Sequence, residues 1–142
     1  MNMTKPLRTK LLALTLVALY TGKAAAVDGV AVIAHPNISK IDAFTVARVF
    51  LGREVYVGGV AVTAVNAATG NALRSRFLQV FVKKDEDSYT GHWIVSRYSG
   101  LGAPPKELAS SADVVKFVQS TPGAIGYIDE ADIKPGMNVL IK

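Results

Sequence analysis

The sequence predicts a single-domain α/β fold built on a mixed, mainly parallel β-sheet. Two observations carry this prediction. Short apolar runs rich in Val and Ile, typical of buried strands, alternate with segments whose apolar residues recur at helical spacing. The 142-residue chain also contains no internal repeat, low-complexity tract or long linker that would divide it. Strands alternating with helices of this size favour βαβ units, in which the strands run parallel.

The first 26 residues have the order of a secretory signal peptide. Lys5, Arg8 and Lys10 precede an apolar core of ten residues, and Ala24 to Ala26 offer a small-residue cleavage site. This core is half of the ~20 residues that a membrane-spanning helix needs. We therefore predict cleavage after about Ala26 and one mature periplasmic domain over residues 27–142.

The basic charge of the chain is concentrated in this leader. The whole sequence has a formal net charge of +5, but four of its 16 basic residues precede residue 27, leaving 12 against 11 acidic residues. A nucleic-acid partner is therefore not expected. The chain has no cysteine, which excludes disulfides, thiolate metal sites and a lipid-anchored lipobox. These features predict a soluble periplasmic protein.

The N-terminal half of the domain is predicted to form strands around one helix. Asp42 is placed to cap the helix and Gly52 to end it. Gly58 and Gly59 form a turn between two extended segments, and the second segment is apolar enough to lie inside the sheet. The predicted elements are a buried strand at 30–34, a helix at 42–51 and extended segments at 55–57 and 60–65.

The C-terminal half is predicted to contain three helices and two strands. A second helix begins near Gly70; its apolar stripe faces inward and Arg74, Arg76 and Gln79 face outward. A third, aromatic helix spans residues 89–98, and packing of its rings on the sheet is favoured over an exposed partner face. The remaining predictions are a fourth helix capped by Ser111 and ended by Pro122-Gly123, and strands at 124–128 and 138–141.

Motifs for catalysis or cofactor binding do not occur in the sequence. His35 and His92 have no second ligand at helical spacing, and the acidic runs at 85–87 and 129–132 are typical of solvated turns. No Gly-x-Ser-x-Gly elbow, Walker phosphate loop or dinucleotide fingerprint is present. We therefore expect neither an enzyme nor a metal or organic cofactor.

The segment before the second helix is the best candidate binding site. Residues 66–71, NAATGN, follow a buried strand and open a helix, where free backbone N–H groups favour an oxyanion. Thr69 or Asn71 could instead serve only as the helix cap, and residue types alone favour this structural role. The candidate anion-binding residues are Thr69, Gly70, Asn71, Ala72 and Arg74.

Three ordered segments resemble the phosphate-binding proteins of ABC transporters, within the periplasmic binding protein superfamily. VAVIAHPN at 30–37 is similar to an apolar strand running into Asn-Pro, and VFLGR at 49–53 is similar to Ile-Phe-Leu-Gly-Lys. TPGAIGYI at 121–128 is similar to a Pro-Gly-Ala-Ile-Gly-Tyr strand. GLGAPPK at 100–106 resembles a segment of short, single-lobe proteins of this kind.

The resemblance implies a three-layer α/β/α fold like one lobe of a periplasmic binding protein. The other lobe has no counterpart here, and of an Arg-x-x-Gly-Ser-Gly-Thr loop only Thr69, Gly70 and Asn71 remain as anion donors. It also implies phosphate or a similar oxyanion as ligand, weakly bound, and a link to ABC-type phosphate uptake through a permease. Pairing of two chains as a homodimer would restore a cleft. The alternative is a non-transport interaction or assembly module that contacts an envelope protein and uses the lobe as a scaffold.

Overall fold

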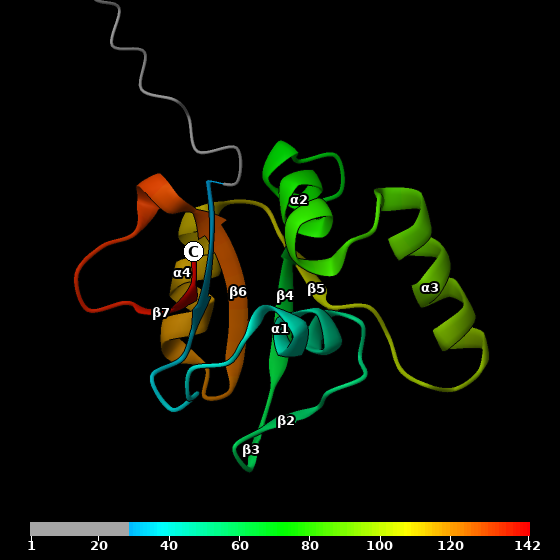
Figure 1. Ribbon diagram of the computed structural model, residues 1–142, viewed down its shortest axis with the longest axis horizontal. Coiled ribbons are helices and arrows are strands. Elements are labelled where there is room, and N and C mark those ends of the chain that lie inside the picture. The colour runs from blue at the N-terminus through cyan, green and yellow to red at the C-terminus, as the bar shows by residue number, and fades with distance from the viewer. Residues whose placement is uncertain (1–28) are drawn as a thin grey trace, which may run out of the picture.

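The computed structural model describes residues 29–142, so the predicted signal peptide at 1–26 and its cleavage site lie outside the described residues (Figure 1). The strands are β1 Val30–Ala34, β2 Tyr56–Val57, β3 Val60–Ala61, β4 Thr63–Ala67, β5 Lys106–Leu108, β6 Ala124–Asp129 and β7 Asn138–Ile141. The α-helices are α1 Ala43–Phe50, α2 Ala72–Phe77, α3 Glu86–Tyr98 and α4 Ser111–Ser120; α2 continues as a π-helix, Leu78–Val82, and a 3₁₀ turn spans Glu130–Asp132.

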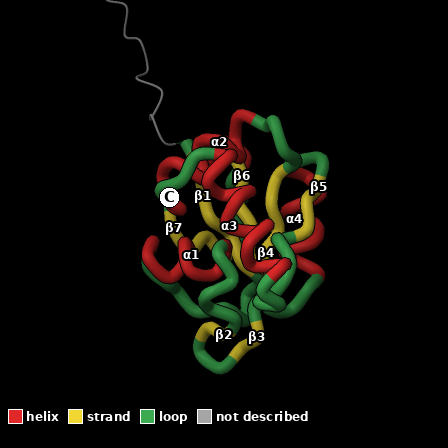
Figure 2. Tube along the Cα trace, turned by 90° about the vertical axis from the view of Figure 1, so that its right-hand side faces the viewer, coloured by secondary structure: helices red, strands yellow, loops and turns green. Residues whose placement is uncertain are grey.

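The central sheet has five strands in the order β5-β4-β6-β1-β7. Strand β4 pairs in parallel with β5 and β6, whereas β1 is antiparallel to both β6 and β7. Strand β1 is thus the one member of the sheet that opposes the other four. The predicted mixed, mainly parallel sheet is confirmed. A separate two-stranded hairpin, β2–β3, extends away from the sheet (Figure 2).

Helices cover both faces of the sheet and give the predicted three layers. Alternate residues of β1 enter different apolar clusters because successive strand side chains point to opposite faces. Val30, Val32 and Ala34 join the cluster that contains α1, α2 and the π-helix. Ala31 and Ile33 join the cluster beneath α4, which lies behind the sheet in Figure 1. The prediction of a three-layer α/β/α domain is confirmed.

Helix α1 begins and ends where the sequence predicts. Asp42 caps it, its Oδ1 accepting the N–H of Thr45 at 2.8 Å. Gly52, with φ of +69°, follows the helix, and a Cβ there would lie 2.7 Å from Cη2 of Trp93. A glycine at this position therefore both turns the chain and lets the Trp93 ring of α3 pack closely against it.

The structure corrects several predicted elements. Residues 60–65 do not form one strand in the sheet, because Val62 N–H bonds to the Val55 carbonyl at 3.0 Å and keeps β3 in the hairpin, while β4 enters the sheet. Ser110, not Ser111, caps α4 by accepting the N–H of Asp113. Strand β5 was not predicted at all.

The described part of the chain, residues 29–142, contains no helix that is long and apolar enough to cross a membrane.

Candidate functional site

The turn between β4 and α2 is shaped by Gly70 and Asn71. Gly70 has φ of +86°, a conformation that glycine adopts without the steric cost of a Cβ. Asn71 is the N-cap of α2, and its Oδ1 accepts the Leu73 N–H at 2.8 Å. The capping role kept open from the sequence is therefore confirmed for Asn71. Ala72, the first residue of α2, is exposed.

Arg74 is buried and fully engaged, so the prediction that it faces outward was wrong. Its side chain is 6% exposed, and its guanidinium makes a bidentate ion pair with Glu86 at 2.9 and 2.6 Å. The Nη1 amino group of Arg74 donates to Glu107 Oε1 at 2.6 Å and to the Ala67 carbonyl at 3.1 Å. Two carboxylates distant in sequence, together with a backbone carbonyl, draw this side chain inward.

Thr69 and Arg74 converge on one carboxylate, that of Glu107. The Thr69 hydroxyl donates to Glu107 Oε1 at 2.6 Å, and the Thr69 N–H donates to Oε2 at 3.4 Å. Strand β5 places the carboxylate there, because its parallel pairing with β4 sets Glu107 opposite Asn66, three residues before Thr69. The predicted anion-binding turn thus holds an oxyanionic group, supplied by the chain itself.

The charges of this cluster stabilise one another. The hydroxyl of Thr69, with Arg74 adding to it, lowers the pKa of the Glu107 carboxyl below its ordinary value. Burial opposes the charge of Arg74, but its hydrogen bonds to Glu86 and Glu107 outweigh burial and raise the pKa of the guanidinium. With one cation and two carboxylates, the cluster has a net charge of −1. An external anion therefore fits beside Thr69 only where Glu107 moves away.

Replacing Thr69 with alanine is expected to raise the pKa of Glu107 toward its ordinary value. A carboxyl whose pKa is lower in the folded state stabilises the fold at pH values above its unfolded pKa, which is about 4.3 for Glu. This stabilisation is lost as the pH falls through the folded-state pKa. Without its hydroxyl donor, Glu107 loses part of that contribution. NMR titration of the side-chain carboxyl carbon measures the change. A Thr63→Ala variant at the other end of β4 serves as control; equal Glu107 titration in both variants contradicts the role of Thr69.

A buried polar network supports the turn from below. Asn66 donates to Tyr89 Oη at 3.0 Å and accepts from Tyr127 Oη at 3.1 Å. Tyr89 donates to the Phe50 carbonyl, and Tyr127 accepts the Ala67 N–H, each at 3.0 Å. Burial raises the pKa of both phenols, which therefore stay neutral. The end of β4 is held in place by hydrogen bonds to α3 and β6, and Tyr89 links α3 in turn to the end of α1.

A hollow of about 430 Å³ lies next to this cluster, between α3 and the segment before β5. Thr69, Arg74 and Glu107 form its polar side, and Trp93 and Pro104 contribute apolar surface. The Nε1 of Trp93 is buried, and no hydrogen-bond partner for it occurs among the residues described. The hollow gives an external ligand access to the predicted site.

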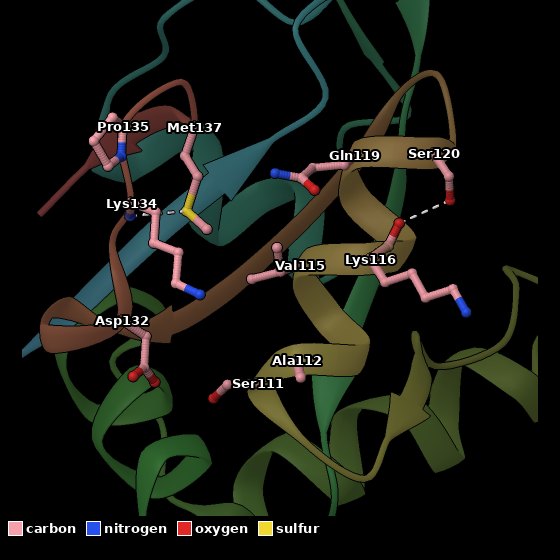
Figure 3. Close-up of a pocket in the computed structure, with 10 residues that line it drawn as sticks. All are labelled: Ser111, Ala112, Val115, Lys116, Gln119, Ser120, Asp132, Lys134, Pro135 and Met137. Carbon is pink, nitrogen blue, oxygen red and sulfur yellow. Dashed lines mark hydrogen bonds between the residues drawn. The ribbon is translucent and has the colours of Figure 1, made fainter.

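A second, larger hollow of about 710 Å³ contains none of the predicted site residues. Its side chains come from α4 and from the segment that leads into β7, as Figure 3 shows. Lys116, Lys134 and Asp132 lie on it with mixed charge. No group of donors there converges on one point as Thr69 and Arg74 do.

Two of the motif segments meet each other rather than the candidate site. Asn37 Oδ1 accepts the Gly123 N–H at 3.1 Å, and the His35 N–H donates to the Ala124 carbonyl at 2.9 Å. These residues join the turn after β1 to the start of β6. Their roles in this chain are structural.

Glu86 and Glu107 are the site residues that sequence reasoning missed. Glu86 was assigned to a solvated acidic run, and Glu107 follows Pro104-Pro105-Lys106, where no strand was predicted. Neither position carries a local signal, since both carboxylates reach Arg74 through tertiary contacts. Among residues 29–142, no cluster of three or more metal-ligating His, Asp or Glu side chains occurs.

The fold of residues 29–142, a mixed five-stranded sheet with helices on both faces, matches part of larger solved structures. Three solved structures share it: a protein assigned as a phosphate ABC transporter substrate-binding protein from Clostridium perfringens with bound phosphate, at 18% identity and a TM-score of 0.63; an ABC-type phosphate transport receptor from Vibrio cholerae, at 12% and 0.55; and PstS from Borrelia burgdorferi, at 18% and 0.58.

The coverage of these likenesses is uneven. Each extends over 80% of this chain but over only 44%, 45% and 47% of the respective structures, so the chain spans under half of their length. The resemblance predicted from the sequence, with its single-lobe form, is confirmed at the level of the fold. No family model matches the sequence. No curated protein matches it either.

Proposed function

We propose that this chain is an exported, binding-protein-like module that binds phosphate or a similar oxyanion at the turn of residues 69–74. One observation carries the proposal: the hydroxyl and N–H of Thr69 and an N–H of Arg74 converge on the two oxygens of a carboxylate. Donors arranged around a carboxylate suit a tetrahedral oxyanion as well, because both present acceptor oxygens to the same N–H and O–H groups. Binding, and not catalysis, is the role we assign.

The binding is weak because Glu107 competes for the same donors. A group in the same chain has an effective concentration in the millimolar range or above. An external anion must therefore reach a comparable concentration to displace the Glu107 carboxylate. The second carboxylate, Glu86, adds repulsion, and the hollow beside the turn is open to water. We expect the dissociation constant of the wild type for phosphate to be about 1 mM.

Localisation and transport belong to the same proposal. We assign the chain to the periplasm after cleavage near Ala26, and we link it to ABC-type phosphate uptake through a permease partner. The likeness to three phosphate-transport proteins supports this assignment at the level of the fold.

The second candidate function, a non-transport interaction module of the envelope, is favoured by a different observation. Helix α3 exposes large apolar side chains to solvent, among them Tyr98 at 90% and Val95 at 65%. Such a surface is typical of protein contacts, and it does not need an anion at the Thr69 turn.

Removal of the Glu107 carboxylate tests the proposal. Glu107→Ala is expected to bind phosphate at least about tenfold more tightly than the wild type, because it frees the donors of Thr69 and Arg74 and removes a negative charge. Calorimetric titration with phosphate and then sulfate measures the affinity. A double variant that adds Thr69→Ala should lose this gain.

Asp129→Ala is the matched control for Glu107→Ala. Asp129 pairs with Arg76 at 3.1 Å, and its side-chain exposure of 42% is close to the 45% of Glu107. The control removes the same charge away from the turn, so it should leave phosphate affinity within about twofold of the wild type. Equal affinity in the two single variants, or no saturable binding by Glu107→Ala, contradicts the proposed site.

A further inference from the structure

Helix α3 is covered on one side only. Of its 13 residues, Tyr89, Trp93 and Ser96 are buried. The helix stands at the margin of the molecule, away from the sheet (Figure 1). Its outer surface and the turn after it expose four large apolar side chains: Ile94 at 52%, Val95 at 65%, Tyr98 at 90% and Leu101 at 74%. Within residues 29–142, the fold leaves these side chains largely exposed to solvent.

Gly91, in the middle of α3, has no structural reason within the described residues. A glycine inside a helix costs roughly 0.5–1 kcal/mol relative to alanine. A Cβ at Gly91 would meet nothing within 4 Å, so no neighbour in residues 29–142 requires a residue this small. Glycine does allow the backbone of another helix to approach closely.

The spacing of these residues places them on one face. Asp87, Gly91, Ile94 and Tyr98 are separated by four, three and four positions, the heptad spacing of a helix that packs along another helix. The buried residues Tyr89, Trp93 and Ser96 lie on the opposite side of the helix. The face therefore points out of the domain, with a glycine at its centre and apolar side chains beside it.

Exposed charges of opposite sign lie at the two ends of α3. Its first turn contains the acidic residue Asp87, and its last turn contains the basic residue Arg97, whereas Glu86 of the first turn is already paired with Arg74. When two copies of this helix lie antiparallel, the acidic end of each lies against the basic end of the other. The antiparallel arrangement also sets opposite ends of the two helix dipoles together. This self-complementarity favours a second copy of the chain as the occupant.

We propose that the chain forms a twofold homodimer through antiparallel packing of α3 against α3. In this arrangement Ile94 of one copy packs over Gly91 of the other, and Asp87 of one copy faces Arg97 of the other. The contact is isologous, so each pairing occurs twice and the assembly closes at two chains. A single helix pair buries less than the ~800 Å² per partner of a standard interface, so the dimer is reversible.

Charge reversal provides the test of this arrangement. Sedimentation velocity of the wild type from about 10 µM to about 1 mM should show its mass rising from one chain toward two. Asp87→Arg and Arg97→Glu should each remain monomeric, because like charges then meet at both ends. Their equimolar mixture should recover the dimer, since every pair in the mixed dimer is again of opposite sign.

Gly91→Leu separates loss of the interface from loss of folding. Leucine has a higher helix propensity than glycine, and its Cβ has open space in the single chain, so thermal stability should not fall. The variant should nevertheless stay monomeric at every concentration. Tyr56→Ala, which alters an exposed aromatic residue of the β2–β3 hairpin, should dimerise like the wild type.

Several outcomes overturn the homodimer. The homodimer is contradicted if the wild type stays monomeric to the highest concentration, or if the Gly91→Leu variant dimerises normally. It is also contradicted if the two charge variants are folded but do not associate when mixed. Ile94, Arg97 and Tyr98 also line the hollow beside the Thr69 turn, so the dimer would cover part of that hollow. These experiments measure association without phosphate, and their failure would contradict the homodimer but not the anion site.

Discussion

Replacement of Phe77 by alanine is expected to lower the free energy of unfolding by about 3–5 kcal/mol. The Phe77 ring is fully buried and packs at ring-centroid distances of 3.8 Å from Tyr127, 4.6 Å from Phe50 and 5.5 Å from Phe81. Alanine leaves a cavity among rings that belong to α1, the π-helix and β6, and these elements cannot all collapse into it. Urea unfolding followed by circular dichroism measures the loss.

Phe44→Ala is the control, because it removes the same ring from a position that is 70% exposed on α1. Its effect should stay within about 0.5 kcal/mol of zero. A loss at Phe77 no larger than the loss at Phe44 contradicts the aromatic core described here. The core also bears on the candidate site, since Tyr127, stacked on Phe77, accepts the Ala67 N–H at the end of β4.

Gly123→Ala is expected to destabilise the domain by more than about 3 kcal/mol. Gly123 has φ of +80°, which costs an L-residue roughly 1–2 kcal/mol. In addition, a Cβ there would clash with the carbonyl oxygen of Ala61, a backbone atom that cannot rotate away. The start of β6 would have to shift, and with it the Asn37 bond to the Gly123 N–H.

Gly70→Ala separates the two causes of this effect. Gly70 has a similar φ of +86°, but a Cβ there meets nothing within 4 Å. Gly70→Ala should therefore lower the free energy of unfolding only by the cost of a positive φ in alanine, about 1–2 kcal/mol. The difference between the two variants, measured by urea unfolding, reports the clash with Ala61. Equal losses in both variants contradict the close approach of β6 to β3.

The elements predicted well are those whose signals are local. The strand at 30–34 is an uninterrupted apolar run, and helix α1 carries a capping Asp42 and a terminating Gly52 within the same stretch of sequence. Strand β5 has neither signal, because it is three residues long and contains Lys106 and Glu107. It pairs with β4 through backbone hydrogen bonds, and the pattern of side chains in the sequence does not indicate such pairing.

The candidate site was predictable in part for the same reason. The turn at 69–71 shows itself through its glycine and its capping residues, so Thr69, Gly70 and Asn71 could be selected from sequence. The inward position of Arg74 depends on Glu86 and Glu107, which are 12 and 33 residues away. Helical position alone placed Arg74 on the outer face, and only tertiary contacts reverse that placement.

The central claim is that the donors of Thr69 and Arg74 form an oxyanion site closed by Glu107. Amide-resolved NMR titration of Glu107→Ala with phosphate tests it most directly, because it reports where the anion binds. We expect saturable shifts that are largest at the amides of Thr69 and Gly70, accompanied by a shift of the Arg74 Nε–H, and much smaller shifts in the wild type at equal phosphate. Shifts absent from this turn, or centred on the hollow beside α4, would contradict the account.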